Sequence, residues 1–242
     1  MSAEMKTNVL VVDDDKEIVG AIAVLLEREG YNIYKAYDGL MALDMVMSND
    51  IHLMLIDVMM PNMDGLSAIM RIRETKNIPI IVLSAKSENT DKVVGLSVGA
   101  DDYISKPYNP MELVARVKSG LRRYMHFGAF GNNGSGRNAD VLTVGGLELQ
   151  LKDKKLLVDG EYVKLTATEF KILELLMRNP GRIYSAEEIY QKVWNEEGFG
   201  VENTVMVHIR HIREKVEINP KEPRYIKVVW GLGYKIEEGN GR

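Results

Sequence analysis

The chain has 242 residues, of which 45% are hydrophobic and 27% charged, a composition typical of a globular protein long enough for two domains. It has no cysteine, which excludes disulfides and thiolate metal sites, and it has neither a signal pattern nor an apolar run near the roughly 18 residues of a membrane span, so we expect a cytoplasmic protein. The net charge of −4 arises in residues 1–124, which hold 14 Lys and Arg against 18 Asp and Glu, because residues 141–242 hold 16 of each.

Residues 1–124 alternate short apolar runs with helical patterns, which predicts repeated βα units around a parallel sheet. The expected strands are residues 9–12, 33–36, 53–56, 80–83 and 103–105. One helix is expected from a stripe that includes Ile18 and Ile22 and ends at Gly30, and four more at residues 38–48, 66–74, 87–98 and 109–124. Five strands and five helices predict an α/β, doubly wound domain.

Residues 125–140 are rich in glycine and asparagine, which predicts a flexible linker before a second domain at 141–242. That domain begins with alternating segments and turn signals, which predict a small antiparallel sheet up to residue 164. Three helices follow. Thr166 and Ser185 are expected to open capping boxes for the first two, and Asn203 is expected to cap the third. A hairpin around Trp230 closes the domain.

Polar side chains follow the strands of the first domain, where ligands of a doubly wound sheet collect. Strand one ends in Asp13-Asp14-Asp15, strand three in Asp57, strand four in Ser84 and strand five in Lys106. Clustered carboxylates need a cation, and with no cysteine present we expect Mg²⁺, or Mn²⁺ in its place, held by oxygen ligands. Asp57 would then be a nucleophile that forms an acyl phosphate. Each residue alone is more typical of a turn, a helix cap or a solvated surface, and only their shared position at successive strand ends favours chemistry.

The first domain resembles the receiver domain of two-component response regulators, a flavodoxin-like fold. The motifs that carry the likeness are Asp13-Asp14-Asp15, Asp57-Val-Met-Met-Pro-Asn-Met-Asp-Gly65, Leu83-Ser84-Ala85 and Gly99-Ala-Asp-Asp-Tyr-Ile-Ser-Lys106-Pro107. The resemblance implies that Asp57 accepts phosphate from a cognate sensor histidine kinase. It also implies that Asp13, Asp14, Asp57 and the Met59 carbonyl hold the metal, that Ser84 and Tyr103 form a switch pair, and that the bond before Pro107 is cis. Asp15 and Tyr108 stand where Glu and Phe are more usual.

The second domain resembles the winged helix-turn-helix domain of the OmpR/PhoB family. A more specific likeness, carried by residues 207–215 and by Val229-Trp230-Gly231, is to VanR-type regulators. The motifs are Leu165-Thr-Ala-Thr-Glu-Phe-Lys-Ile-Leu173, Asn203-Thr-Val-Met-Val-His-Ile-Arg210 and Trp230-Gly-Leu-Gly-Tyr234. The family implies that the third helix enters the major groove of promoter DNA and that the hairpin reaches a minor groove. The expected contacts are Asn203, Thr204, His208, Arg210, His211, Arg213, Lys215, Trp230 and Lys235. Arg is frequent at the positions of His211 and Trp230. Because a Trp cannot supply the charge of an Arg, Trp230 is expected to contact sugar or to pack on the hairpin, and the alternative is packing in the core.

The family further implies a homodimer on phosphorylation and RNA polymerase as a partner. The dimer face would comprise Lys92, Asp101, Asp102, Glu112, Arg116 and Arg123, although exposed charges of this kind are often only a solvated face. Zero net charge on the second domain favours cooperative binding, since one copy should bind DNA weakly. We therefore expect a phosphorylation-dependent transcription regulator and no enzyme beyond self-phosphorylation and autodephosphorylation.

Two alternatives remain at this stage. A magnesium-dependent phosphohydrolase would use the same aspartyl phosphate, but it normally needs a second acid two residues after the nucleophile, where this chain has Met59. A constitutive DNA-binding protein would use the first domain only as an interaction module.

Overall fold

The computed structural model describes residues 7–84, 98–129, 140–196 and 201–237. Contacts divide the chain into two compact units, Met1–Tyr124 and Met125–Arg242. Each unit has its own core and is described by itself. The helix expected at 87–98, with Lys92, lies almost entirely outside the described residues. No helix in the described part of the chain is long and apolar enough to cross a membrane.

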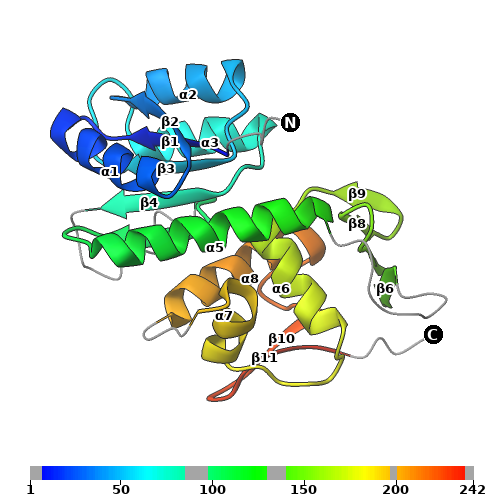
Figure 1. Cartoon of the computed structure of the whole chain (residues 1–242). Helices are drawn as coiled ribbons and strands as arrows, with labels where there is room; N and C mark the ends of the chain where they lie inside the picture. Colours follow the sequence, from blue (N-terminus) through cyan, green and yellow to red (C-terminus); the bar gives the residue numbers. More distant parts are fainter. Residues whose placement is uncertain (1–6, 85–97, 130–139, 197–200, 238–242) are drawn as a thin grey trace, which may run out of the picture. The chain divides into compact units, whose positions relative to one another are not determined.

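The first unit is built on a five-stranded parallel sheet in the order β2-β1-β3-β4-β5 (Figure 1). The strands are β1 (Asn8–Val12), β2 (Asn32–Ala36), β3 (Leu53–Asp57), β4 (Ile80–Ser84) and β5 (Asp102–Ser105). The helices are α1 (Lys16–Arg28), α2 (Gly39–Ser48), α3 (Gly65–Thr75) and α5 (Pro110–Ala129). This confirms the predicted α/β, doubly wound class.

The central strands have no polar face. Every residue of β3 and of β4 is buried, because helices cover both sides of a parallel sheet. The strand order reverses between β1 and β3, and such a switch point leaves a crevice at the carboxyl ends of the strands. Asp57 ends β3 at this edge and is opposite Leu83 in the register. The fold therefore explains why an acid can end an otherwise apolar strand.

Aspartates begin three of the helices in this unit. Asp15, Asp38 and Asp64 each accept a hydrogen bond from a backbone N–H in the first turn of α1, α2 and α3 respectively. Side-chain caps of this kind stabilise a helix by about 1 kcal/mol. Part of the acidic excess in this unit thus has a purely local role.

The last helix of the unit is longer than predicted. α5 runs to Ala129, whereas we expected it to end at Tyr124 and a flexible linker to begin at residue 125. The predicted end of this helix was wrong, because the Met, His and Phe that follow Tyr124 are compatible with a helix. Residues 130–139, the rest of the predicted linker, lie outside the described residues.

The second unit has the elements of a winged helix. Its strands are β6 (Val141–Val144), β7 (Leu147–Gln150), β8 (Lys155–Val158) and β9 (Glu161–Val163) in one antiparallel sheet, and β10 (Ile226–Val229) and β11 (Gly233–Ile236) in a hairpin. The helices are α6 (Ala167–Met177), α7 (Ala186–Trp194) and α8 (Glu202–Val216). They pack around an apolar core that includes Phe170, Ile189, Trp194, Val205 and Ile212.

The helix starts in this unit test three of the predictions. Both capping boxes are present, Thr166 with Glu169 and Ser185 with Glu188, so those two are confirmed. The third is wrong. α8 begins at Glu202 after Val201, which makes no side-chain cap, so Asn203 lies inside the first turn.

Candidate functional site

Three predicted site residues meet at the carboxyl edge of the parallel sheet. Lys106 Nζ lies 2.6 Å from Oδ2 of Asp13 and 2.7 Å from Oδ1 of Asp57. The other Asp57 oxygen, Oδ2, accepts a hydrogen bond of 2.8 Å from the Met59 N–H. Asp57 is only 5% exposed. Its carboxylate is therefore mostly buried, and each of its two oxygens has a partner.

Burial and charge act in opposite directions on these groups. Burial raises the pKa of Asp13, and the hydrogen bonds from Lys106 and from the Asp15 N–H only partly offset that effect. Burial would lower the pKa of Lys106, but its hydrogen bonds to Asp13 and Asp57 outweigh burial and raise that pKa. Lys106 is therefore a cation across the physiological pH range, placed to neutralise added negative charge.

The remaining predicted residues of this edge lie on β4 and β5. Ser84 ends β4 and is opposite Ser105 in the register, and Tyr103 of β5 is opposite Val82. The Lys106–Pro107 peptide bond is cis, which confirms that prediction. Ser84 and Tyr103 thus lie on the two strands that follow β3 on that side of the sheet.

The oxygen atoms at this edge suit a hard cation, but a complete ligand set is not assembled around one point. Asp14 is exposed next to the buried Asp13, and Asp13 and Asp57 both face the ammonium of Lys106. No group of three or more His, Asp or Glu side chains in the described ranges is arranged to hold a metal ion. Carboxylate and carbonyl oxygens at an open strand end nevertheless fit the chemistry of Mg²⁺ better than that of a softer metal.

Gly65 is a further residue of the site, and its role was not predicted from the sequence. Gly65 begins α3 so close to the end of β3 that an added Cβ would lie 2.0 Å from the carbonyl oxygen of Asp57. Its N–H donates to the carbonyl of Val58 at 2.9 Å. Glycine is needed here for close backbone approach, and the Asp64-Gly65 pair at a helix start was the available signal.

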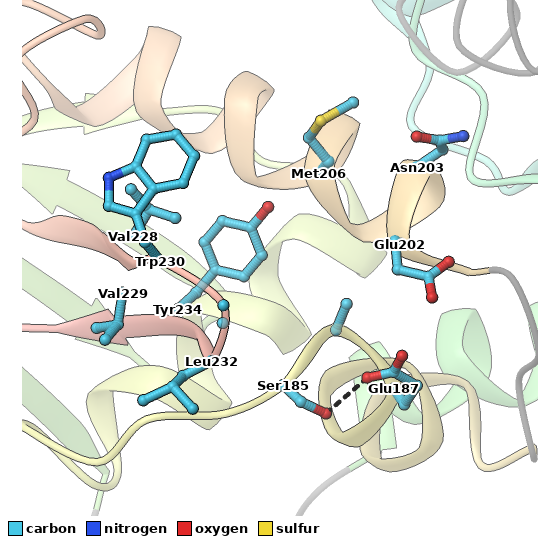
Figure 2. A pocket seen from close by; sticks show the side chains of 13 residues that line it. Ser185, Glu187, Glu202, Asn203, Met206, Val228, Val229, Trp230, Leu232 and Tyr234 are labelled. Carbon is cyan, nitrogen blue, oxygen red and sulfur yellow. Dashed lines mark hydrogen bonds between the residues drawn. The ribbon is translucent and has the colours of Figure 1, made fainter.

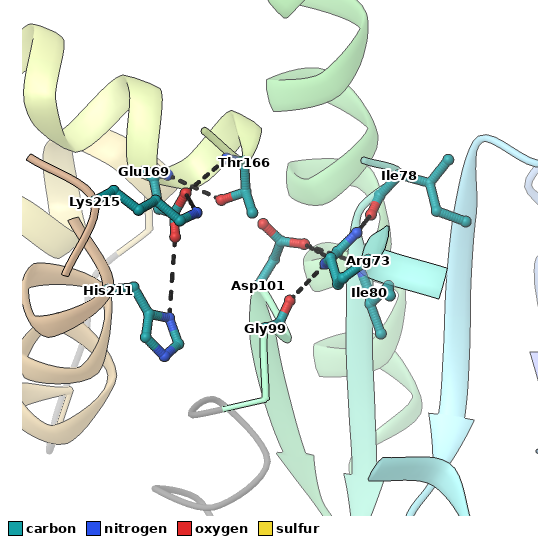
Figure 3. Close-up of polar contacts among 9 residues, drawn as sticks. All are labelled: Arg73, Ile78, Ile80, Gly99, Asp101, Thr166, Glu169, His211 and Lys215. Atoms are coloured by element: carbon teal, nitrogen blue, oxygen red, sulfur yellow. Dashed lines mark hydrogen bonds and ion pairs between the residues drawn. The ribbon is translucent and has the colours of Figure 1, made fainter. Parts of the chain in front are cut away.

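The described residues of the predicted dimer face, which exclude Lys92, have partners within the chain. Arg73 of α3 donates to the Asp101 carboxylate at 2.7 Å and to the Gly99 carbonyl at 2.8 Å, and the same Asp101 oxygen accepts from the Ile80 N–H at 3.0 Å (Figure 3). On α5, Arg116 pairs with Asp102 and Glu112, both at 3.0 Å. Arg123 donates to Ser119 Oγ at 2.7 Å. If these charged side chains formed salt bridges across a symmetric dimer, some of them would have to break the intrachain contacts described above.

The helix predicted to read DNA has several of its basic residues engaged within the unit. Lys215 Nζ lies 2.6 Å from Oε2 of Glu169 on α6, and His211 Nδ1 lies 4.0 Å from the other oxygen of that carboxylate (Figure 3). Arg213 donates two hydrogen bonds, of 3.0 and 2.7 Å, to the carbonyl of Ile226 on β10. These contacts tie α8 to α6 and to the hairpin.

Other predicted DNA contacts differ in their surroundings. His208 is only 2% exposed, and its ring lies 5.5 Å from that of the buried Trp194, centroid to centroid, so the prediction that His208 contacts DNA is wrong. Arg210 is exposed and pairs with Glu214 at 2.8 Å, an i,i+4 pair on the surface of α8. Asn203 and Thr204 are partly exposed in the first turn of that helix.

The position of Trp230 at the hairpin tip decides whether this side chain packs in the core. Trp230 is 88% exposed, so the expectation of core packing is wrong.

Behind the tip lies a groove of about 330 Å³ between the hairpin and the starts of α7 and α8, lined among others by Glu187, Glu202 and Met206 (Figure 2). Lys235 of β11 pairs with Glu237 at 2.7 Å.

Comparisons with known proteins agree for both units. The family model described as "Response regulator receiver domain" matches residues 9–118, and "Transcriptional regulatory protein, C terminal" matches residues 160–236. Regulatory protein VanRc of Enterococcus gallinarum is 40% identical over 234 residues, which cover 97% of this chain and 100% of the relative. Regulatory protein VanR of Enterococcus faecium is 40% identical over 235 residues, with 97% and 100% covered.

Solved structures share this order of domains. The response regulator DrrB, described as a Thermotoga maritima OmpR/PhoB homolog, is 29% identical with a TM-score of 0.50, covering 96% of this chain and 100% of that one. A mutant of RitR has a TM-score of 0.74 at 24% identity over 96% and 100% of the two chains, which supports the fold alone.

Proposed function

The chain belongs to the OmpR/PhoB family of two-component response regulators, and on that premise we propose that Asp57 is its phosphoacceptor, with residues 1–124 as receiver and 141–242 as DNA-binding domain. Members of this family are phosphorylation-dependent transcription regulators and not catalytic enzymes, which disfavours the phosphohydrolase and constitutive alternatives. A histidine kinase and DNA are the partners that this domain pair implies. The proposed place of action is the cytoplasm.

A single observation carries the assignment of Asp57. It is a mostly buried carboxylate whose two oxygens are held separately, Oδ1 by Lys106 and Oδ2 by the Met59 N–H. A nucleophile held in this way loses little freedom on reaction, and the neighbouring ammonium favours the charge that arrives with a phosphoryl group.

In the proposed transfer an Asp57 oxygen attacks the phosphorus of a phosphohistidine. A P–O bond forms, the P–N bond breaks, and its electron pair stays on the imidazole nitrogen of the kinase. The product is an acyl phosphate on Asp57. Lys106 neutralises one phosphoryl oxygen, and Ser84 donates to another while Tyr103 changes its packing, which alters the neighbouring face of the unit.

Asp13, Asp14, Asp57 and the Met59 carbonyl are the proposed ligands of Mg²⁺, or of Mn²⁺. When bound, the cation supplies charge stabilisation for the transferring phosphoryl group. Within this set Asp13 has a second role, since it binds Lys106 and accepts the Asp15 N–H at 3.0 Å.

The proposed output is a homodimer that binds promoter DNA and meets RNA polymerase there. The dimer face would comprise Lys92, Asp101, Asp102, Glu112, Arg116 and Arg123. The DNA surface would comprise Asn203, Thr204, Arg210, His211, Arg213, Lys215, Trp230 and Lys235, without the buried His208. Two linked DNA-binding units gain affinity from effective concentration, which suits a domain with no net charge.

The test compares the wild type with Asp57→Asn and with Asp44→Asn, a control at an exposed carboxylate on α2. Each is incubated with acetyl phosphate and Mg²⁺, and mass spectrometry, light scattering and DNA footprinting are recorded. We expect the wild type and Asp44→Asn to gain one phosphoryl group, dimer and footprint, and Asp57→Asn to gain none. Equal phosphorylation and footprints in all three would refute the proposal.

A further inference from the structure

The loop between β3 and α3, residues 58–64, supplies backbone groups to the candidate site. Its Met59 N–H donates to Oδ2 of Asp57 at 2.8 Å, and the Gly65 N–H after it donates to the Val58 carbonyl at 2.9 Å. The Met59 side chain is 67% exposed, so its packing contributes little to holding that N–H in place. Contacts made further along the loop therefore have to fix its position.

The middle of this loop is bound to the start of α2. Asn62 Nδ2 donates to Oδ2 of Asp38 at 2.9 Å, and the Gly39 N–H donates to the Met63 carbonyl at 3.1 Å. Two neighbouring residues of one segment thus bind two neighbouring residues of the other. We call these two hydrogen bonds the loop clamp.

The backbone adopts an uncommon conformation where the loop clamp forms. Asn62 has a φ of +64°, in the left-handed region that asparagine tolerates and that glycine adopts with less strain. Since glycine would relieve this strain, the asparagine points to a role for its amide. At Gly39 a Cβ would lie 2.6 Å from the Met63 carbonyl oxygen, so a larger residue would push the two segments apart.

Asp38 uses its two oxygens for different contacts. Oδ1 accepts the Met41 N–H at 2.8 Å and caps α2, and Oδ2 accepts the Asn62 amide. These hydrogen bonds hold the pKa of Asp38 below its usual range, so its carboxylate is ionised at neutral pH. A hydrogen bond to an ionised acceptor is about twice as strong as one between neutral groups. One acid therefore fixes both the start of α2 and the loop.

We propose that Asp38 and Asn62 are positioning residues for phosphoryl transfer to Asp57. The loop clamp keeps the Met59 N–H on one Asp57 oxygen and leaves the other oxygen to Lys106. Both positioning residues act through the loop and not on the reacting atoms. Without the clamp, the Met59 N–H leaves Asp57 more often, and the carboxylate spends less time in the reactive orientation. The inference rests on the proposed assignment of Asp57 as phosphoacceptor.

Asn62→Gly tests the clamp, because it removes the amide and suits the backbone conformation. The full-length variant, given acetyl phosphate and saturating Mg²⁺, is expected to take up the phosphoryl group about fivefold more slowly, the effect of one lost hydrogen bond. Hydrogen exchange of the Met59 N–H, followed by NMR in EDTA, should be faster by about the same factor. Asp38→Ser still caps α2 but has no second oxygen for Asn62, so it should behave like Asn62→Gly.

Exchange of the two side chains provides a rescue. Asn62→Asp alone places two carboxylates together and should slow uptake at least as much as Asn62→Gly. Asp38→Asn combined with Asn62→Asp restores an amide–carboxylate bond in the reverse direction and should recover most of the uptake rate. Asn49→Ala is the matched control, since Asn49 donates to the Met45 carbonyl at the other end of α2. That control weakens the same helix away from the loop and should leave uptake and exchange unchanged.

Wild-type uptake in both Asn62→Gly and Asp38→Ser would overturn the proposal. Slower uptake with unchanged exchange of the Met59 N–H would also overturn it, because the loop would then not carry the effect. Equal slowing by Asn49→Ala would assign the effect to the stability of α2 and overturn it as well. A wild type that takes up no phosphoryl group would instead refute the proposed function, and the exchange measurement would still test the clamp.

Discussion

Lys106 holds Asp13 and Asp57 at the same time, with its Nζ 2.6 Å from one carboxylate and 2.7 Å from the other. The ammonium screens two carboxylates that would otherwise repel each other across a mostly buried site. One side chain therefore contributes to the stability of the first unit and, under the proposed function, also to the reception of a phosphoryl group.

Lys106→Met should lower the free energy of unfolding of the first unit by about 1–3 kcal/mol in EDTA, because two carboxylates lose their charged partner. Urea unfolding followed by circular dichroism measures the change. Asp13→Asn in the same background should recover part of the loss. Lys118→Met is the control, since Lys118 and Glu29 form an exposed pair that solvent screens. Equal losses in Lys106→Met and Lys118→Met would show that the Lys106 contacts contribute no more than a surface pair.

Gly65→Ala should destabilise the first unit by about 1–3 kcal/mol and slow phosphoryl uptake, because the new Cβ would overlap the Asp57 carbonyl at 2.0 Å and force α3 away from β3. Gly20→Ala provides the comparison, since Gly20 lies within α1 and a Cβ there meets nothing within 4 Å. That substitution should stabilise the unit by about 0.5–1 kcal/mol. Urea unfolding and phosphorylation by acetyl phosphate test both. Wild-type behaviour of Gly65→Ala would mean that the close approach is not required.

Lys215→Met should lower the stability of the second unit by about 1–3 kcal/mol even without DNA, since Glu169 loses its 2.6 Å partner. Both tryptophans of the chain, Trp194 and Trp230, lie in this unit, so their fluorescence in urea reports its unfolding. Lys235→Met should cost at most about 1 kcal/mol, because its partner Glu237 is half exposed. If the two variants lost the same stability but differed in DNA affinity, Lys215 would be a DNA contact and not a tie between α8 and α6.

Glu174→Gln should make the second unit less sensitive to acid. Burial alone would raise the pKa of Glu174, but its bonds to Arg178 and Lys171 outweigh burial and hold that pKa below its usual range. A carboxyl whose pKa is lowered on folding stabilises the protein above its unfolded pKa, and that contribution is lost as the pH falls through the folded value. The wild type should therefore lose more stability on acidification than Glu174→Gln.

Tryptophan fluorescence during unfolding at a series of pH values measures this difference. Glu214→Gln is the control, because Glu214 pairs with Arg210 on an exposed part of α8. It should follow the wild-type pH profile, and a Glu174→Gln profile that also matched the wild type would contradict the prediction.

Local patterns of residues were sufficient to predict the strands of the first unit, the two capping boxes and the position of the acids. A run such as that of residues 53–56 is apolar on both faces, so it predicts a buried parallel strand, and Asp57 after it must lie at the open edge. Thr166 with Glu169 acts within one helix turn, so local spacing was sufficient.

Contacts between residues far apart in the chain could not be predicted from such patterns, because they depend on how the elements pack. Arg213 donates to the Ile226 carbonyl, and Lys215 pairs with the Glu169 carboxylate. Both contacts depend on how α8 packs against the hairpin and α6, which no local pattern encodes. The exposure of Trp230 likewise depends on where the Tyr184–Tyr234 bridge holds the hairpin, since an indole is apolar enough for the core and common enough at interfaces for either place. Periodicity and spacing specify what a residue does within its own element, and packing specifies which residues from different elements meet.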